Sequence, residues 1–508
     1  MFMFSSFGMI GAAFSPSSLV FLFFGCLLGI IVGALPGLTA TMAVSLLVSL
    51  TYSLDKYSAL AMLISVYLGA IYGGSRSAIL LNVPGTPSSA ATALDGFPLA
   101  KKGEGALASI VATTVSAFGG LFGLLALLFT TPLIAALSLK FGVWEYFWLA
   151  MFGIVIGSKL TTSTFVKGMI GGFLGLFVSC IGMDEIHGTA RFIFGNQQMM
   201  GGISLVPAMI GLFGFAEALD SIMNPDSHKI VDSGFRKQSL WSLFRTSVQM
   251  TLSKTHIFNF IRSSVIGTII GAIPGVGPDI ASWSAYGAAK QASKHKELFG
   301  NGSYEGLMAS ETANNAATSG VFIPLLTLGI PGCAVTAVII GAMRLHGLRP
   351  GPTFFFDSPE MVGFIAAALF ITNIFIIVQG VGLTKIIEKV LDLPVSMIMG
   401  VVIVLSVIGS YAISIRMFDV YTMLAFGLIG FVMRRLKIPA APMALGIILG
   451  PLADLNFRRA MYASFDSIKP FLVRPISVVL YVSLALLIVG PVFGTLAKAF
   501  KAGRKAVK

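Results

Sequence analysis

Apolar residues form long stretches along this chain, and short polar breaks separate them. A helix needs about 20 mostly apolar residues to cross a membrane, and stretches of near that length recur from Leu19 to Val492. A transmembrane β-barrel would show segments of about ten residues that alternate in polarity, whereas residues 121–128 and 478–489 are apolar on every face. The pattern predicts an all-α polytopic membrane protein with about 10 to 12 transmembrane helices and additional re-entrant hairpins.

The clearest spans are expected near residues 106–136, 145–158, 166–182, 203–219, 360–383, 393–413, 418–433, 438–452 and 471–493. Shorter stretches that glycine and proline interrupt lie before and between them. The longest polar stretch, residues 220–262, is basic, and residues 241–252 within it have the pattern of an amphipathic helix at the membrane interface. Because basic loops face the cytoplasm, we place this stretch and the basic tail after Lys498 on the cytoplasmic side.

Composition and charge agree with a membrane protein. Hydrophobic residues make up 56% of the 508 residues and charged residues 11%, where soluble proteins have roughly 25% charged residues. The formal net charge of +13 lies in loops and in the tail. Basic residues concentrate in the cytoplasmic loops of membrane proteins, so this excess does not imply binding of nucleic acid. The three cysteines lie far apart in apolar or glycine-rich surroundings and are interpreted as packing residues.

An internal repeat divides the chain into two halves. The motif GIIVGALPG at residues 29–37 recurs as GTIIGAIPG at 267–275, and LNVPG at 81–85 recurs as LGIPG at 328–332. The first half lacks Lys and Arg before Lys56 and the second follows the basic loop, which predicts opposite orientations. Inverted repeats with broken helices are the recurrent plan of secondary transporters. The predicted boundaries are repeat 1 at about 18–219, a cytoplasmic connector at about 220–262, repeat 2 at about 263–440, and C-terminal helices with a basic cytoplasmic tail at 441–508.

Each Pro-Gly pair is expected to break a helix at membrane depth, because proline lacks a backbone N–H and glycine lowers helix stability. The stretches after two of the breaks, residues 38–52 and 276–289, are rich in small and hydroxyl residues and are interpreted as returning arms of re-entrant hairpins. The N-terminus of a half-helix presents free N–H groups and a positive dipole end, which suits an anion. The alternative is a packing kink, but four breaks in two matched pairs favour an anion site.

The predicted anion-binding residues lie at and around the breaks. They are Gly37, Thr39, Arg76, Pro84, Gly85, Thr86, Ser88, Gly275, Asn314, Asn315, Pro331 and Gly332. Small hydroxyl and amide side chains can line a narrow polar cavity, although membrane helices also pack through such residues.

Three ionisable residues lie in or beside the broken segments: Arg76, Asp279 and Glu311. An ion at the centre of a membrane helix costs roughly 2.5 to 3.5 kcal/mol on insertion scales. Arg76 is a candidate to neutralise a substrate carboxylate, and Asp279 and Glu311 are candidates to hold a coupling Na⁺ or proton. The alternative for each is a place at the interface or an ion pair within the protein.

Catalytic function has no support in the sequence. The five histidines lack ligand spacing, and neither a Gly-x-Ser-x-Gly motif nor a Walker-type loop is present. We expect no enzymatic activity, no cofactor, and no metal beyond a transported Na⁺.

Several ordered blocks resemble the large membrane subunit of the tripartite tricarboxylate transporters, the TctA family, over about residues 18–440. The blocks are residues 33–39 (GALPGLT), 72–75 (YGGS), 79–87 (ILLNVPGTP), 94–103 (LDGFPLAKKG), 271–275 (GAIPG), 311–316 (ETANNA), 328–332 (LGIPG) and 346–352 (HGLRPGP). The resemblance implies a bacterial inner-membrane permease that works with a small membrane subunit and a periplasmic solute-binding protein. Such systems import carboxylates, either a tricarboxylate such as citrate or a related dicarboxylate or aromatic carboxylate, and an ion gradient drives them.

One residue departs from the pattern of this family. An uncharged residue usually stands where this chain has Arg76, so either the transported anion differs or Arg76 is turned to a water-exposed edge. Two other functions compete with a transporter. An anion channel would need a continuous pore, and an intramembrane enzyme would need a nucleophile with a base or a metal cluster. The matched broken helices favour alternating access in a lipid bilayer.

Overall fold

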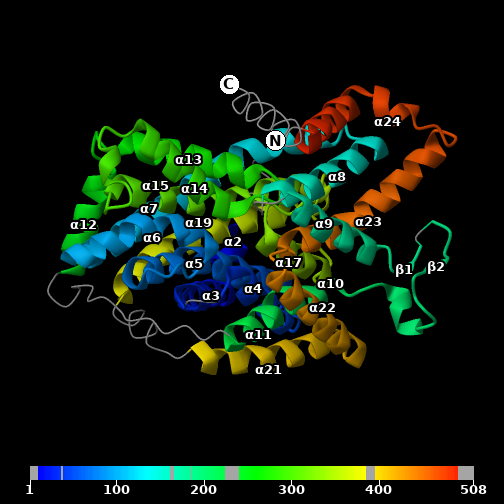
Figure 1. Ribbon diagram of the computed structural model, residues 1–508, viewed down its shortest axis with the longest axis horizontal. Coiled ribbons are helices and arrows are strands. Elements are labelled where there is room, and N and C mark those ends of the chain that lie inside the picture. The colour runs from blue at the N-terminus through cyan, green and yellow to red at the C-terminus, as the bar shows by residue number, and fades with distance from the viewer. Residues whose placement is uncertain are drawn as a thin grey trace, which may run out of the picture. The chain divides into compact units, whose positions relative to one another are not determined.

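The structure is a computed structural model that describes residues 10–35, 38–160, 165–184, 186–223, 239–384 and 395–489. Within these residues the regular structure is helical apart from one short antiparallel pair, β1 (Gly182–Met183) with β2 (Ala190–Arg191) (Figure 1). Seven of the described helices are long and apolar enough to cross a membrane, and shorter apolar helices accompany them. The prediction of an all-α polytopic membrane protein is therefore confirmed.

The helices follow one another in this order. The first half contains α2 (Ile10–Ala13), α3 (Pro16–Ala34), α4 (Ala40–Thr51), α5 (Lys56–Leu81), η2 (Pro87–Ser89), α6 (Ala90–Leu99), η3 (Ala100–Glu104), α7 (Gly105–Ser138), α8 (Val143–Leu160), α9 (Phe165–Ser179), η4 (Gln197–Gly201), α10 (Leu205–Met209), η5 (Ile210–Phe215) and α11 (Ala216–Met223). The second half contains α12 (Leu240–Thr251), α13 (Ile257–Ala272), α14 (Gly277–Ala292), η7 (Lys296–Leu298), α15 (Tyr304–Gly320), α16 (Phe322–Leu328), α17 (Ala334–Leu345), α18 (Phe354–Asp357), α19 (Pro359–Gly382), α21 (Val395–Ser414) and α22 (Met417–Arg435). After it come α23 (Ala440–Ala463), α24 (Lys469–Val473) and an apolar helix at Pro475–Val489.

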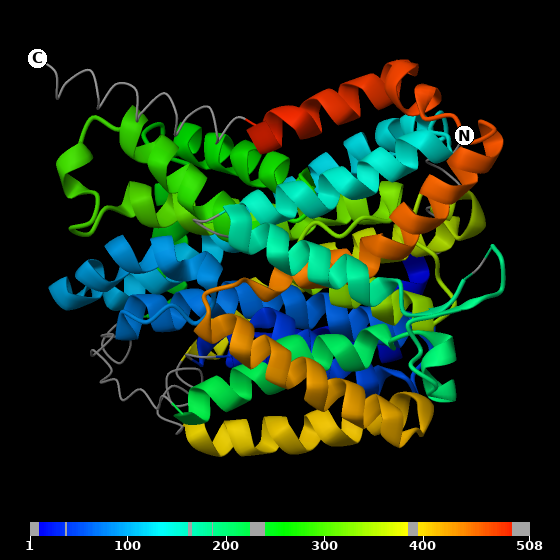
Figure 2. The ribbon, with the colours of Figure 1, turned by 45° about the vertical axis from the view of Figure 1, so that its right-hand side comes forward.

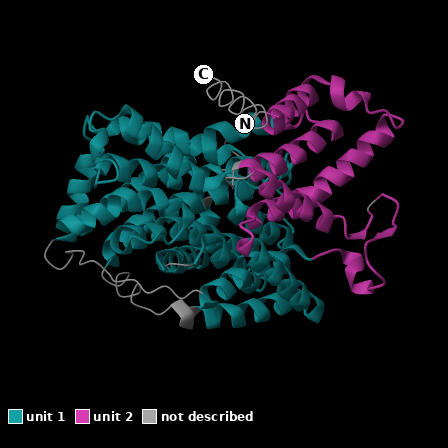
Figure 3. Cartoon of the chain, in the orientation of Figure 1, with its two compact units in different colours: residues 1–136, 204–433 teal, residues 137–203, 434–508 magenta. Residues whose placement is uncertain are grey.

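The chain forms two compact units (Figure 3). Unit 1 comprises residues 1–136 and 204–433, and unit 2 comprises residues 137–203 and 434–508. Unit 1 contains the Pro-Gly motifs of both predicted halves. The boundaries assigned to the repeats and the connector stay predictions.

The same helix packing occurs in both halves of unit 1. In the first half α3 lies along α5, and a Cβ at Gly29 would come within 2.4 Å of the Val66 carbonyl oxygen (Figure 2). In the second half α13 lies along α15, and a Cβ at Gly267 would come within 2.3 Å of the Ala313 carbonyl oxygen. Small residues let membrane helices approach at backbone distance. The repeated motif therefore corresponds to a repeated contact.

The helix ends before the Pro-Gly motifs also match. Asn82 and Gly329 occupy equivalent places in the repeat and both adopt the left-handed conformation, with φ of 59° and 70°. Each residue caps its helix, α5 or α16. A left-handed residue of this kind commonly ends a helix, so the break begins two residues before the proline.

α7 and α19 run antiparallel. A Cβ at Gly120 would meet the amide oxygen of Asn373, and a Cβ at Gly380 would lie 2.7 Å from Cγ2 of Thr113. Because numbers rise along α7 while they fall along α19, the start of α19 lies toward the C-terminal end of α7. The 34 residues of α7 span about 50 Å.

The loops that follow the two returning arms lie at opposite ends of this helix pair. Lys56, just after the first arm, forms an ion pair of 3.6 Å with Glu360 at the start of α19. Asn301, after the second arm, accepts a hydrogen bond of 2.7 Å from Lys102, just before α7. Opposite ends are what an inverted pair of repeats requires.

The amphipathic helix predicted at residues 241–252 is present as α12. Leu243, Ser247 and Thr251 form its buried side, and the Ser247 hydroxyl donates to the Thr114 hydroxyl at 2.8 Å. Trp241 is exposed. The position of α12 at the membrane interface stays a prediction.

Unit 2 is built on close packing of α9 and α23. A Cβ at Gly175 would lie 2.0 Å from the Met443 carbonyl oxygen, and one at Gly446 would lie 2.2 Å from that of Gly172. Glycine is therefore required at this contact, because the two backbones leave no room for a side chain.

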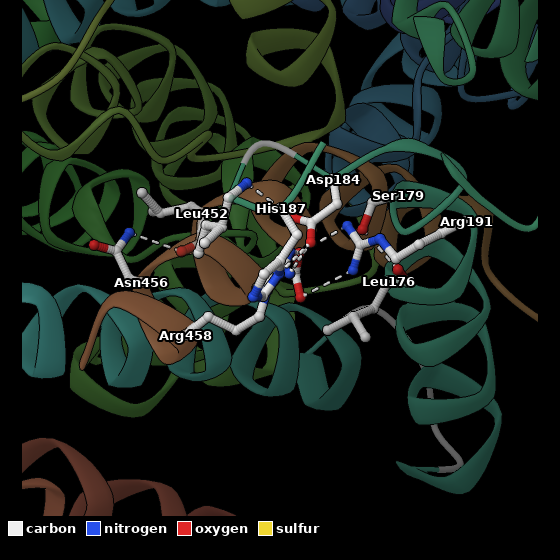
Figure 4. A network of polar contacts seen from close by, with 10 residues as sticks. Leu176, Ser179, Asp184, His187, Arg191, Leu452, Asn456 and Arg458 are labelled. Atoms are coloured by element: carbon white, nitrogen blue, oxygen red, sulfur yellow. Dashed lines mark hydrogen bonds and ion pairs between the residues drawn. The ribbon is translucent and has the colours of Figure 1, made fainter. Parts of the chain in front are cut away.

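A polar network attaches the β1–β2 segment to α23 (Figure 4). Arg458 donates to Asp184 at 2.6 Å and to Asp454 at 2.7 Å, and Arg191 donates to Asp454 at 2.9 Å. The N–H of Ile186 also donates to Asp184, at 3.0 Å. The Arg458 guanidinium and this N–H hold the pKa of Asp184 well below its usual range.

A first prediction concerns orientation in the membrane. We expect cysteines introduced as Ser53→Cys and Lys294→Cys, both at exposed or partly exposed loop positions, to react with an impermeant maleimide from opposite sides of the membrane. Both variants are made in a background that carries Cys180→Ser, because Cys180 is not buried whereas Cys26 and Cys333 are. Labelling of both positions from the same side of intact cells would show that the inverted arrangement is wrong.

A second prediction concerns the polar network of unit 2. Because the pKa of Asp184 is lowered in the folded state, its stabilising effect is present above its unfolded pKa of about 3.9 and is lost as the pH falls through the folded value. We expect the β1–β2 segment to open more readily below about pH 4. The variant Asp184→Asn should open it more readily at pH 7 and should weaken the dependence of opening on pH. Amide hydrogen exchange, corrected for intrinsic rates, measures the opening. The exposed Asp466→Asn is the control, and a wild-type pH profile in Asp184→Asn would contradict the prediction.

Candidate functional site

The segments that follow the Pro-Gly motifs meet across the two halves of unit 1. In one contact η2, after Pro84-Gly85, packs on α14, which follows Pro274-Gly275. In the reciprocal contact α17, after Pro331-Gly332, packs on α4. Pro36 and Gly37, which precede α4, lie outside the described residues. The structure thus brings together arms from both halves, as an anion site between them requires.

The glycines at the breaks allow close backbone packing. A Cβ at Gly85 would lie 1.9 Å from the Gly33 carbonyl oxygen, and one at Gly332 would lie 2.6 Å from Cβ of Val321. Gly275 has φ of +79°, and its N–H donates to the Pro331 carbonyl at 3.2 Å, which joins the two breaks of the second half. A side chain at these positions would therefore separate the segments whether or not a ligand is bound.

The predicted hydroxyl residues cap the arms. Thr39 accepts a hydrogen bond of 3.1 Å from the N–H of Met42 at the start of α4. Thr86 and Ser88 are both buried, and their hydroxyl oxygens lie 2.9 Å apart. Pro84 is partly buried and Pro331 is buried. Thr39 thereby satisfies a free backbone group in the first turn of α4.

Glu311 lies at the centre of a buried cluster of neutral donors. Its carboxylate accepts hydrogen bonds from Thr92 at 2.5 Å, from Ser116 at 2.9 Å and from Asn314 at 3.3 Å. The Ser310 hydroxyl lies 3.1 Å from that of Thr92. The cluster joins α6 and α7 of the first half to α15 of the second. A carboxylate among several hydroxyl and amide oxygens is a ligand set that suits a hard cation or a proton.

The two adjacent asparagines extend this cluster. The Asn314 amide also lies 3.5 Å from the Ser88 carbonyl oxygen, next to the first-half arm. Asn315 donates to the Asn314 amide oxygen at 2.5 Å, and the amide oxygen of Asn315 is buried without a hydrogen-bond partner. An unpaired buried acceptor is costly, so this oxygen is available for a ligand.

Arg76 is buried within α5, with 1% of its surface exposed. Its guanidinium donates to the Tyr72 hydroxyl at 3.0 Å, to the Thr113 hydroxyl at 3.0 Å and to the Gly380 carbonyl oxygen. Nη1 has no partner. The alternative that placed Arg76 at a water-exposed edge is therefore wrong, because α3, α4 and α6 of the first half and α15 and α19 of the second pack around α5.

Asp279 lies apart from these two groups. It is in the first turn of α14 and its side chain is accessible. Among the described residues no hydrogen bond or ion pair joins it to Arg76 or Glu311. The two predicted coupling residues therefore do not form one site in this conformation.

Five members of the buried network lie outside the predicted set: Tyr72, Thr92, Thr113, Ser116 and Ser310. Thr113 and Ser116 are three residues apart in α7 and so share a helix face. Their spacing within an apolar segment is a signal that the sequence contains. Thr92 had no comparable signal, since its partner Glu311 lies 219 residues away.

Comparison with known proteins agrees with the geometry. Residues 19–445 match the tripartite tricarboxylate transporter TctA family. A protein of Agrobacterium vitis, described as an uncharacterized 52.8 kDa protein in the TAR-I ttuC' 3' region, is 37% identical over 469 residues, which cover 92% of this chain and 91% of that protein. Another from the same organism, described as an uncharacterized protein in the TAR-II ttuC' 3' region, is 38% identical over 211 residues, 42% of this chain and 87% of that protein. No solved structure matches the chain.

The family match extends over both halves and over every Pro-Gly motif, and it includes the buried core around Arg76 and Glu311. The chain therefore belongs to the tripartite tricarboxylate transporter TctA family, whose members are membrane components of transport systems.

Proposed function

We propose that this chain is the permease subunit of a bacterial inner-membrane system that imports a carboxylate by cation-coupled alternating access. Its proposed partners are a small membrane subunit and a periplasmic solute-binding protein, as in the tripartite systems of its family. The carboxylate is held between the arms of the two halves, and Na⁺ or a proton is held at Glu311.

One observation carries this proposal: the core shared by the two halves contains two opposite charges that do not pair with each other. Neutral donors hold Glu311, neutral acceptors hold Arg76, and no carboxylate in the described part of the chain lies within 4.0 Å of the Arg76 guanidinium. A purely structural role would favour a direct ion pair, since an unpaired buried charge is expensive. Separate charges instead leave one place for an anion and one for a cation.

The arrangement also explains how binding is linked to movement. The Glu311 cluster contacts α6 and α7 of the first half, and Arg76 contacts α19 of the second half. A bound cation and a bound anion therefore each bias contacts between the halves. Matched broken helices around a central site are the usual basis of alternating access, whereas a channel would need a continuous pore.

A third prediction tests coupling. We reconstitute the chain with its two partner subunits in proteoliposomes and measure accumulation of labelled carboxylate under an imposed Na⁺ or H⁺ gradient. Glu311→Gln keeps the size of the side chain and removes its charge. Gradient-driven accumulation should therefore fall at least about tenfold, equivalent to losing one charged hydrogen bond. Exchange of labelled for unlabelled carboxylate, measured without a cation gradient, should continue. Omission of the solute-binding protein should reduce uptake as well.

Glu360→Gln is the control, because Glu360 lies at the start of α19, where it pairs with Lys56. Asp279→Asn tests the other predicted coupling residue in the same assay. Wild-type accumulation and cation dependence in Glu311→Gln would contradict the coupling role. Uptake that only equilibrates the carboxylate, whatever the gradient, would favour an anion channel.

A further inference from the structure

Arg76 is the one lysine or arginine side chain that is buried in the described part of the chain. It is also among the largest fully buried side chains. A buried cation without a counter-charge is strongly unfavourable, and proteins retain one where a charge must be received.

Three contacts fix the orientation of the guanidinium. The Tyr72 hydroxyl accepts from Nε, and Nη2 donates to Thr113 and to the Gly380 carbonyl oxygen. The Tyr72 and Thr113 hydroxyls also lie 2.8 Å apart, so each holds the other. These contacts occupy Nε and Nη2, and Nη1 is the nitrogen that has no partner. A carboxylate bound at Nη1 would therefore not displace any of these hydrogen-bond partners.

The other buried charged residues in the described part of unit 1 are acidic, so they offer no second cation for a substrate. Asp95 accepts from the N–H groups of Gly300, Gly302 and Ser303 at 2.8 to 3.0 Å. Asp419 pairs with Arg416, which is partly exposed. When the proposed coupling cation balances Glu311, Arg76 compensates one substrate carboxylate, and each additional carboxylate would lack a compensating charge in the protein and would bear the cost of desolvation.

From this charge balance we infer that the substrate is a monocarboxylate, held by its single carboxylate at Nη1 of Arg76, with the rest of the molecule uncharged. The inference rests on the proposed transport function and narrows its substrate class. Tyr72 is then a positioning residue, since it acts on the anion through Arg76. A tricarboxylate would place two uncompensated charges beside Glu311.

Ligand binding to the purified chain tests this inference. The probes are butanoate, glutarate and tricarballylate, which carry one, two and three carboxylates on related short skeletons, at pH 7.5 and constant ionic strength. Thermal unfolding is followed over a concentration series. We expect butanoate to stabilise the chain at a concentration at least tenfold lower than tricarballylate. Equal or stronger stabilisation by tricarballylate, or no stabilisation by any probe, would overturn the inference.

Three variants assign the effect to Arg76. Arg76→Gln should weaken butanoate binding at least tenfold, because it removes a charged hydrogen bond. Arg76→Lys keeps the charge, so it should keep the preference for butanoate but bind it more weakly. This variant allows selectivity to be measured even if Arg76→Gln does not fold. Tyr72→Phe leaves Nε without an acceptor while Nη2 keeps Thr113 and Gly380, so it should reduce the ratio between butanoate and tricarballylate binding more than it changes unfolding without ligand.

Arg262→Gln is the matched control, since Arg262 donates to Asn259 in α13 away from this network. Unchanged selectivity in all three variants would show that Arg76 does not set the substrate class. The binding measurement needs no transport. A reconstituted system that fails to transport therefore contradicts the proposed function, whereas a system that transports but binds tricarballylate best contradicts only this inference.

Discussion

Every polar group inside a membrane protein must find its partner within the protein or in a ligand, because the hydrocarbon offers none. This constraint governs the core of unit 1. The Pro-Gly breaks free backbone groups, and the protein satisfies them with caps such as Thr39 and with bonds between breaks such as Gly275 to Pro331. Glycine also packs directly against backbone, as at Gly85 and Gly33, so no room for a side chain is left between these segments. The broken helices are stable because their ends satisfy one another.

The charged groups obey the same constraint in a different way. One carboxylate oxygen of Asp95 accepts from three backbone N–H groups, which secure the loop before α15 to α6. Glu311 and Arg76 are held only by neutral partners. Asp95 therefore has a structural role in holding this loop, whereas Glu311 and Arg76 lie in the core that the two halves share. That difference separates the architecture of the core from its function.

Much of this organisation could be predicted from the sequence, because apolar length and repeated Pro-Gly motifs are local signals. α7, α19 and α22 follow the predicted spans closely, and the repeated motifs do pack alike. α5 was not among the predicted spans, since serines, glycines and Arg76 interrupt its apolar run. Its polar residues are buried by helices distant in sequence. Contacts such as Thr92 with Glu311 depend on tertiary structure and leave no local trace.

The central claim is that one site is shared by arms of both halves, and hydrogen exchange measures this most directly. The full chain is compared with and without the carboxylate and the cation that the reconstituted system transports. The account predicts joint protection of amides in residues 86–89, at η2, and in residues 277–282, at the start of α14, when both ligands are present. Protection confined to the arm of one half, or unchanged exchange in both arms with ligand bound, would contradict it.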